Sequence, residues 1–209
     1  MGSSSFLPIV YLHLLGGTAV TFASSEYPLA KGLLYTIGMA LASLLLIFIL
    51  LAQSPGPLKY GVALIYCAVI GQLMSSLVQK LEHKQLLIQV IASVLGIFLG
   101  MSVVGFLDNQ NILGFGGYLV AGLLGLLVAR IGLMIAYGVG ADASSISSVN
   151  KILSWIGTAL FAVFVAYDTQ LLKKEMKSLK KPDYVNSSLG LYLDIINLFS
   201  DVGNLMGGE

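Results

Sequence analysis

The sequence predicts an all-α, polytopic membrane protein with seven transmembrane helices. Of its 209 residues, 57% are hydrophobic and 10% are charged, whereas a soluble domain has roughly 25% charged residues. Apolar stretches alternate with short polar turns, and about 20 mainly apolar residues are enough to cross a bilayer. The net charge of +1 gives no electrostatic reason to expect a nucleic-acid partner.

The seven predicted spans form one domain. They comprise residues 6–24, 32–52, 60–78, 86–107, 112–137, 151–172 and 187–206. The Ser-rich residues 1–5 are expected to be a disordered tail. The first span carries His13, which is either a proton carrier or, as we favour, a hydrogen-bonded packing residue. The second span carries no charge and ends at a turn that contains Pro55 and Pro57.

The third span ends at a charged turn, residues 79–85, in which His83 is expected at the surface. The fourth ends at the polar residues 108–111. The fifth has small residues at four-residue steps, a ridge that permits close helix contact; these are Gly117, Ala121, Gly125 and Ala129.

Arg130, the single arginine of the chain, also lies in the fifth span. It could pair with a deep carboxylate, or it could snorkel to the membrane interface; we favour snorkelling. Residues 138–150, rich in Gly and Ser, are expected to be a loop before the sixth span. Asn186 or Ser187 is expected to cap the seventh.

The turn between spans six and seven holds the densest basic cluster. By the positive-inside rule this turn is cytoplasmic, which places the amino terminus inside and the carboxyl terminus on the opposite side. Lys59 is counted as a loop residue on the same side. The cluster consists of Lys173, Lys174, Lys177, Lys180 and Lys181.

The last span carries a polar stripe. Asp194, Asn197, Asp201 and Asn204 recur at steps of three, four and three residues, which places them on one helix face. An ionisable residue at bilayer depth must face protein or water, so this helix is expected in the core of the bundle. Asp201 is either a pore-lining acid or, as we favour, a residue at a wet helix end.

Asp168, about a turn before the lysine cluster, is the second deep carboxylate. Because a short turn joins the last two helices, Asp168 and Asp194 are expected at similar depth and within hydrogen-bonding reach. Burial and a neighbouring carboxylate both oppose ionisation, so the pair should share a proton and titrate as a unit. When ionised, it offers oxygen ligands to a hard cation such as calcium. The alternative is a static hydrogen-bonded clamp.

Two strings resemble the signature of the Bax inhibitor family, the transmembrane BAX-inhibitor-motif proteins. They are AYDTQLL at residues 166–172 and LYLDIINLF at residues 191–199. The resemblance implies seven helices with the last one surrounded by the other six, and a pH-sensitive calcium leak whose paired aspartates are Asp168 and Asp194. Calcium is then a permeant or transient ligand, and no other cofactor is implied.

The resemblance also implies roles in calcium homeostasis and in suppressing cell death. Eukaryotic or viral members would lie in endoplasmic reticulum or Golgi membranes and bacterial ones in the plasma membrane. Bacterial relatives carry an acidic residue in the second helix and a basic cluster after it, which latch the aspartate pair. Here residues 32–52 are uncharged, so the latch is missing or replaced, by Arg130 or Lys59.

Two rival functions remain. An intramembrane aspartyl protease would need Gly-x-Gly-Asp where this chain has Leu-Tyr-Leu-Asp at residues 191–194, and a later Pro-Ala-Leu that does not follow; we therefore predict that the protein is not an enzyme. The second rival is a non-conducting interaction protein that binds cell-death regulators or other membrane proteins. Loss of Asp168 or Asp194 would change a leak but would leave partner binding intact.

Overall fold

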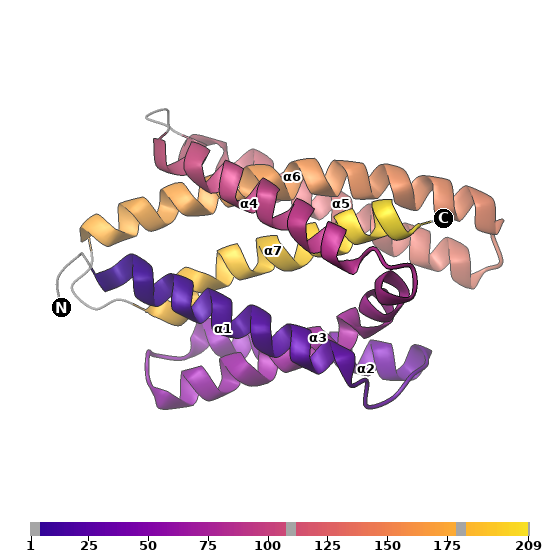
Figure 1. Ribbon diagram of the computed structural model, residues 1–209, viewed down its shortest axis with the longest axis horizontal. Coiled ribbons are helices and arrows are strands. Elements are labelled where there is room, and N and C mark those ends of the chain that lie inside the picture. Colours follow the sequence, from indigo (N-terminus) through magenta and orange to yellow (C-terminus); the bar gives the residue numbers. More distant parts are fainter. Residues whose placement is uncertain (1–4, 108–111, 179–182, 209) are drawn as a thin grey trace. The chain divides into compact units, whose positions relative to one another are not determined.

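A computed structural model describes residues 5–107, 112–178 and 183–208, and this part of the chain is helical with no β-strand (Figure 1). The predicted all-α class is confirmed. Residues 1–4 of the predicted tail, residues 108–111, and Lys180 and Lys181 of the basic cluster lie outside the described residues. The elements are α1 (Phe6–Glu26), α2 (Leu33–Ala52), α3 (Pro57–His83), α4 (Leu87–Leu107), the 3₁₀ helix η2 (Ile112–Phe115), α5 (Gly116–Gly138), α6 (Ala143–Ser178) and α7 (Tyr184–Gly207).

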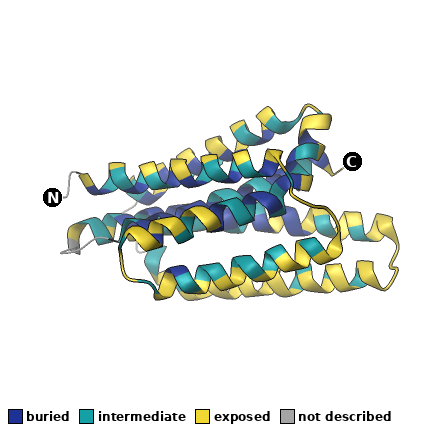
Figure 2. Ribbon diagram, turned by 90° about the horizontal axis from the view of Figure 1, so that it is seen from below, coloured by how far each residue is buried: buried dark blue, intermediate teal, exposed yellow. Residues whose placement is uncertain are grey.

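Six helical segments of the described chain are long and apolar enough to cross a membrane: α1, α2, α3, α4, η2 with α5, and α6. Their outer faces carry large exposed apolar side chains, among them Leu34 at 87% and Ile88 at 81% exposure. Such faces suit contact with lipid rather than water. In α2 the single buried residue is Leu50, and most of α5 is exposed as well (Figure 2). The seventh helix, α7, is more polar because its stripe interrupts the apolar residues.

The sixth helix begins earlier than its apolar span predicts. Residues 143–150, expected to be a loop, form the first two turns of α6. Asp142 explains this start, because its Oδ2 accepts hydrogen bonds from the Ser145 amide at 2.9 Å and from the Ser144 hydroxyl at 2.5 Å. A carboxylate at this position satisfies amide groups that have no partner within the helix.

The third and seventh helices also begin earlier than predicted. Lys59 is not a loop residue but lies in the first turn of α3, where its side chain is 1% exposed and pairs with Asp183. Asp183, rather than Asn186 or Ser187, caps α7, since its Oδ1 accepts the Asn186 amide at 3.1 Å. The predicted turn at residues 79–85 is helical as far as His83, which is exposed as expected.

The chain divides into two compact units, residues 1–82 with 174–192, and residues 83–173 with 193–209. Helices α6 and α7 contribute to both. The placement of α7 at the centre of the other helices stays a prediction.

In the first unit, α1 and α3 approach closely at Gly71, where a Cβ atom would overlap the Thr21 carbonyl oxygen. The next residue of α3, Gln72, secures the connection from α1 to α2 through its side-chain amide. Its Nε2 donates to the carbonyl of Tyr27 at 3.1 Å, and its Oε1 accepts the Leu29 amide at 2.9 Å. A buried amide with these partners holds the loop without leaving backbone groups unpaired.

In the second unit, the small-residue ridge of α5 makes no close internal contact at Gly117 or Gly125, where an added Cβ would meet nothing within 4 Å. Gly117, Ala121 and Gly125 are exposed, and Ala129 is half-buried. Different glycines of α5 face α6. A Cβ at Gly116 would meet the Tyr167 ring, and one at Gly122 would lie 3.2 Å from the Leu160 side chain. Sequence spacing identified a ridge, but the helix turns another face inward.

Candidate functional site

The two predicted aspartates both belong to the second unit. Asp168 is half-buried on α6, and Asp194 on α7 is 4% exposed. The Asp168 carboxyl is near enough to interact electrostatically with the Asp194 carboxyl. The Oδ2 atom of Asp194 is buried and accepts no hydrogen bond from the protein. A carboxyl in this setting is either protonated or needs a cation or water to complete its coordination.

Residues of the AYDTQ string fix the position of α6 beside Asp168. The close approach of α4 occurs at Gly105, where a Cβ would overlap the Ala166 carbonyl and the Thr169 side chain. On the following turn Gln170 Oε1 accepts the Leu113 amide of η2 at 3.2 Å. These contacts determine the depth and rotation of α6, and so the direction in which Asp168 projects.

The next turn of α6 is also tied to α4. The Lys173 ammonium donates to the Phe106 carbonyl at 2.7 Å, and so neutralises part of the negative end of α4. Lys173 was predicted to lie in the cytoplasmic turn, but it belongs to α6 and is half-buried. The end of the apolar segment is therefore a structured junction of α4, η2 and α6.

A second charged pair lies further along α7. Arg130 of α5 donates through Nη2 to Oδ1 of Asp201. The Asp201 side chain is fully buried, and that of Arg130 is 31% exposed. The favoured predictions that Arg130 snorkels and that Asp201 lies at a wet helix end are therefore wrong, and the alternative of pairing with a deep carboxylate is confirmed. The reason is that Asp201 faces into the second unit, where burial without a counter-charge would be costly.

The remaining polar residues of the stripe are less buried. Asn197 and Asn204 are both half-buried, and Asn197 Nδ2 donates to the Leu193 carbonyl at 2.8 Å. The role of Asn197 in lining a path stays a prediction.

The two cations considered as replacements for the missing latch pair with acids other than Asp168 and Asp194. Arg130 pairs with Asp201, and Lys59 pairs with Asp183 at 2.6 Å while also donating to the Gln53 carbonyl at 2.9 Å. Lys59 thereby joins the turn before α3 to the start of α7.

No cluster of three or more His, Cys, Asp or Glu side chains that could hold a metal ion occurs within residues 5–107, 112–178 and 183–208. Two carboxylates alone provide few ligands for calcium, which takes six to eight oxygens. Any calcium at Asp168 and Asp194 would therefore keep water ligands and bind transiently.

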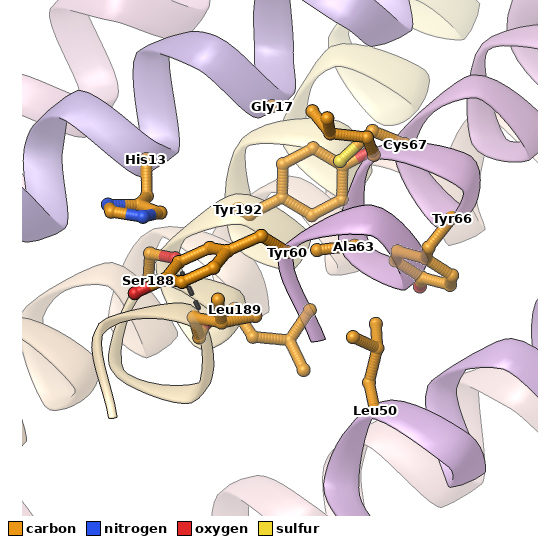
Figure 3. A pocket seen from close by; sticks show the side chains of 12 residues that line it. His13, Gly17, Leu50, Tyr60, Ala63, Tyr66, Cys67, Ser188, Leu189 and Tyr192 are labelled. Carbon is orange, nitrogen blue, oxygen red and sulfur yellow. Dashed lines mark hydrogen bonds between the residues drawn. The ribbon is translucent and has the colours of Figure 1, made fainter. Parts of the chain in front are cut away.

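A small, mostly apolar cavity of about 70 Å³ lies in the first unit, bordered by α1, α2, α3 and α7 (Figure 3). The Tyr192 ring lies at its inner end beside Gly17 and Cys67, and its hydroxyl is 2.6 Å from the Thr21 hydroxyl. His13 also borders the cavity. Its Nδ1 donates to the Ile9 carbonyl at 2.7 Å, as a hydrogen-bonded packing residue would.

Two residues that shape the site were missed by sequence reasoning. Gly105 admits α6 next to Asp168, and Gly157 of α6 lies against the Arg130–Asp201 pair. Both are isolated glycines within apolar helices, where glycine is unfavourable by roughly 1 kcal/mol relative to alanine and so indicates a packing requirement. Which helix each glycine faces could not be read from the sequence.

Comparison with known proteins identifies the family. A family model described as "Inhibitor of apoptosis-promoting Bax1" matches residues 3–209. A protein of Borreliella burgdorferi is 28% identical over 205 residues, which cover 91% of this chain and 84% of the relative. A protein of Deinococcus radiodurans is 31% identical over 196 residues, with 90% and 81% covered. The inner membrane protein YbhL of Escherichia coli is 28% identical over 186 residues, with 84% and 75% covered. With its membrane-spanning helices, this chain is a multi-pass integral membrane protein and belongs to the Bax inhibitor-1 family.

Proposed function

We propose that this protein is a pH-dependent calcium leak in which Asp168 and Asp194 are the proton sensor and the gate. The observation that supports the proposal most directly is the Asp194 carboxyl. This carboxyl is buried, its Oδ2 accepts no hydrogen bond, and the Asp168 carboxyl interacts with it electrostatically. Two acids in such an environment interact strongly enough to exchange protons as a unit.

The protonation state of this pair would control both packing and ion binding. With one proton shared, a carboxylic acid can donate to the neighbouring carboxylate, and α6 and α7 are held together. With both groups ionised, the like charges repel each other and provide oxygen ligands for a hard cation. The junction of α6 with α4 and η2 keeps Asp168 in place, so the movement would fall mainly on α7.

The test is calcium efflux from proteoliposomes that contain the purified protein, scanned from about pH 5 to pH 8, the range in which a strongly perturbed carboxyl pair can titrate. The Asp168→Asn/Asp194→Asn variant should lose the pH dependence of efflux. Asp142→Asn is a matched control, because Asp142 is an exposed acid at the start of α6; it should respond to pH like the wild type.

Two results would argue against the proposal. A double variant whose efflux follows pH like that of the wild type would remove Asp168 and Asp194 from the sensor. Wild-type efflux no higher than that of empty liposomes at every pH would favour the non-conducting alternative, in which the protein acts by binding other membrane proteins and the aspartates serve as a structural clamp.

A further inference from the structure

An ion pair in the second unit bears on the charges that a permeating cation would meet along the polar face of α7, here called the α7 path. Asp201 follows Asp194 by seven residues on the same polar face of α7, about 10 Å along the helix axis. A cation that leaves the Asp168–Asp194 pair along this face would meet Asp201 next. In this protein Asp201 is paired with Arg130 of α5.

The surroundings of Asp201 are adapted to the pair. Gly157 of α6 lies directly against it: a Cβ there would overlap Asp201 Oδ2 and would lie 3.1 Å from Arg130 Nη2. Ser154, one turn earlier on α6, is fully buried. Residues of α5, α6 and α7 thus meet around one acid and one base, whose formal charges sum to zero.

The pair is incompletely hydrogen-bonded. Asp201 Oδ2 and Arg130 Nε are both buried without a hydrogen-bond partner, although Nη2 and Oδ1 are joined. A purely structural pair would be expected to use both nitrogen–oxygen contacts of the planar guanidinium, since the two-contact geometry is the more stable one. The pair therefore links α5 to α7 through one nitrogen–oxygen contact.

We propose that Arg130 determines the charge of the α7 path by neutralising Asp201, so that the Asp168–Asp194 pair is the one place on this face that attracts a cation. The inference rests on the proposed leak, and it assigns Arg130 as a selectivity-determining residue rather than as a latch on the aspartate pair.

The two sides of the pair are chemically unequal, and this inequality makes the proposal testable. Asp201→Asn leaves Arg130, which cannot lose its proton in a protein and so stays positive. Arg130→Gln leaves a buried carboxyl, which can take up a proton and become neutral. In Asp201→Asn the remaining positive charge of Arg130 should therefore repel cations, whereas Arg130→Gln leaves no charge that repels them.

The size of the effect follows from Coulomb's law. A fixed positive charge about 10 Å from a divalent cation, at an effective dielectric constant between about 20 and 80, lowers cation occupancy by roughly 4-fold to 200-fold. We expect Asp201→Asn to reduce calcium efflux by about tenfold within this range. Arg130→Gln should not reduce it, and Arg130→Gln/Asp201→Asn should restore it to within about threefold of the wild type, because no net charge remains.

Efflux is measured per amount of protein that elutes as one folded species before reconstitution, so that misfolded protein does not enter the comparison. Arg130→Lys is the matched control: it keeps the positive charge that neutralises Asp201, so its calcium efflux should match that of the wild type. If Asp201→Asn does not fold, Arg130→His/Asp201→Asn provides the same charge reversibly. Compared with Arg130→Gln/Asp201→Asn at each pH, its efflux should fall as the imidazole becomes protonated.

The outcomes separate this inference from the proposed function. Equal loss of efflux in Arg130→Gln and Asp201→Asn would show that the pair is structural and would overturn the inference. Wild-type efflux in Asp201→Asn would overturn it too, even if Asp168→Asn/Asp194→Asn loses its pH dependence and the leak itself stands. A wild-type protein without efflux would instead refute the leak.

Discussion

Replacing Lys59 with Met removes one side of the ion pair that joins α3 to the start of α7. The Lys59 side chain is 1% exposed, and its ammonium has two acceptors, Asp183 Oδ2 at 2.6 Å and the Gln53 carbonyl at 2.9 Å. Met has a similar length and fills the same space without the charge. The partner left behind, Asp183, is 23% exposed and still accepts the Asn186 amide.

The expected cost differs between the two sides of the pair. Breaking a buried ion pair typically destabilises a protein by about 3–5 kcal/mol. Because water reaches Asp183, we expect Lys59→Met to lower the free energy of unfolding by about 2 kcal/mol. Asp183→Asn keeps a capping side chain on α7 but strands a buried ammonium, so it should cost about 3–5 kcal/mol. The double variant should lose about 1 kcal/mol or less, since replacing both charges is often nearly neutral.

The assay is a double-mutant cycle on the unfolding free energy in mixed detergent micelles, with the wild type, both single variants and the double variant. A coupling energy of at least about 2 kcal/mol between Lys59 and Asp183 is expected for groups in direct contact at this burial. Additive effects, with coupling under about 0.5 kcal/mol, would refute the reasoning and show that the pair is solvated in the membrane protein.

Two further predictions concern α4 and the start of α6. Gly105→Ala should destabilise the protein by about 1–3 kcal/mol in the same unfolding assay, because the added carbon meets a backbone carbonyl of α6 that cannot move aside. Gly100→Ala, in open space on the same helix, is the control and should stabilise the protein by up to about 1 kcal/mol. Equal effects of the two substitutions would contradict the close approach of α4 and α6 at Gly105. Hydrogen bonds from Ser144 and Ser145 hold the pKa of Asp142 below its usual value. The cap of α6 is therefore fully present above that usual value and is lost as the pH falls through the lowered pKa. The amide proton shift of Ser145 should titrate with a midpoint below about pH 3.9, the usual pKa of aspartate, and a midpoint at or above that pH would contradict the hydrogen bonds.

The fold class could be predicted because the apolar stretches are long and the turns between them are polar. Hydropathy identified the membrane-spanning segments but not the ends of the helices. Residues 143–150 are polar and Ser-rich, so they read as a loop, although Asp142 followed by Ser144 and Ser145 is a local capping signal that could have placed the start of α6. Lys59 was taken for a loop residue because the charge suggested solvent, and its partner Asp183 is 124 residues away.

The candidate site was predicted less completely than the fold. The spacing on α7 placed Asp194 and Asp201 on one face, and both are buried. Spacing could not show that Arg130, 71 residues before Asp201, would neutralise one of the two acids. The side of α5 that faces α6 was likewise undetermined, because small residues occur on two faces of that helix. Contacts between distant segments decide these points, and a single sequence does not encode them in any local pattern.

The position of Gly157 has a consequence for how this family can diversify. Asp201 occupies the space that a side chain at residue 157 would need, so the two positions cannot change independently. We expect homologous chains that keep an acid at the position of Asp201 to keep glycine at the position of Gly157, whereas chains with a smaller residue there are free to carry alanine or serine on α6. The ion pair would then be inherited or lost as a unit, together with the one residue on a third helix that makes room for it.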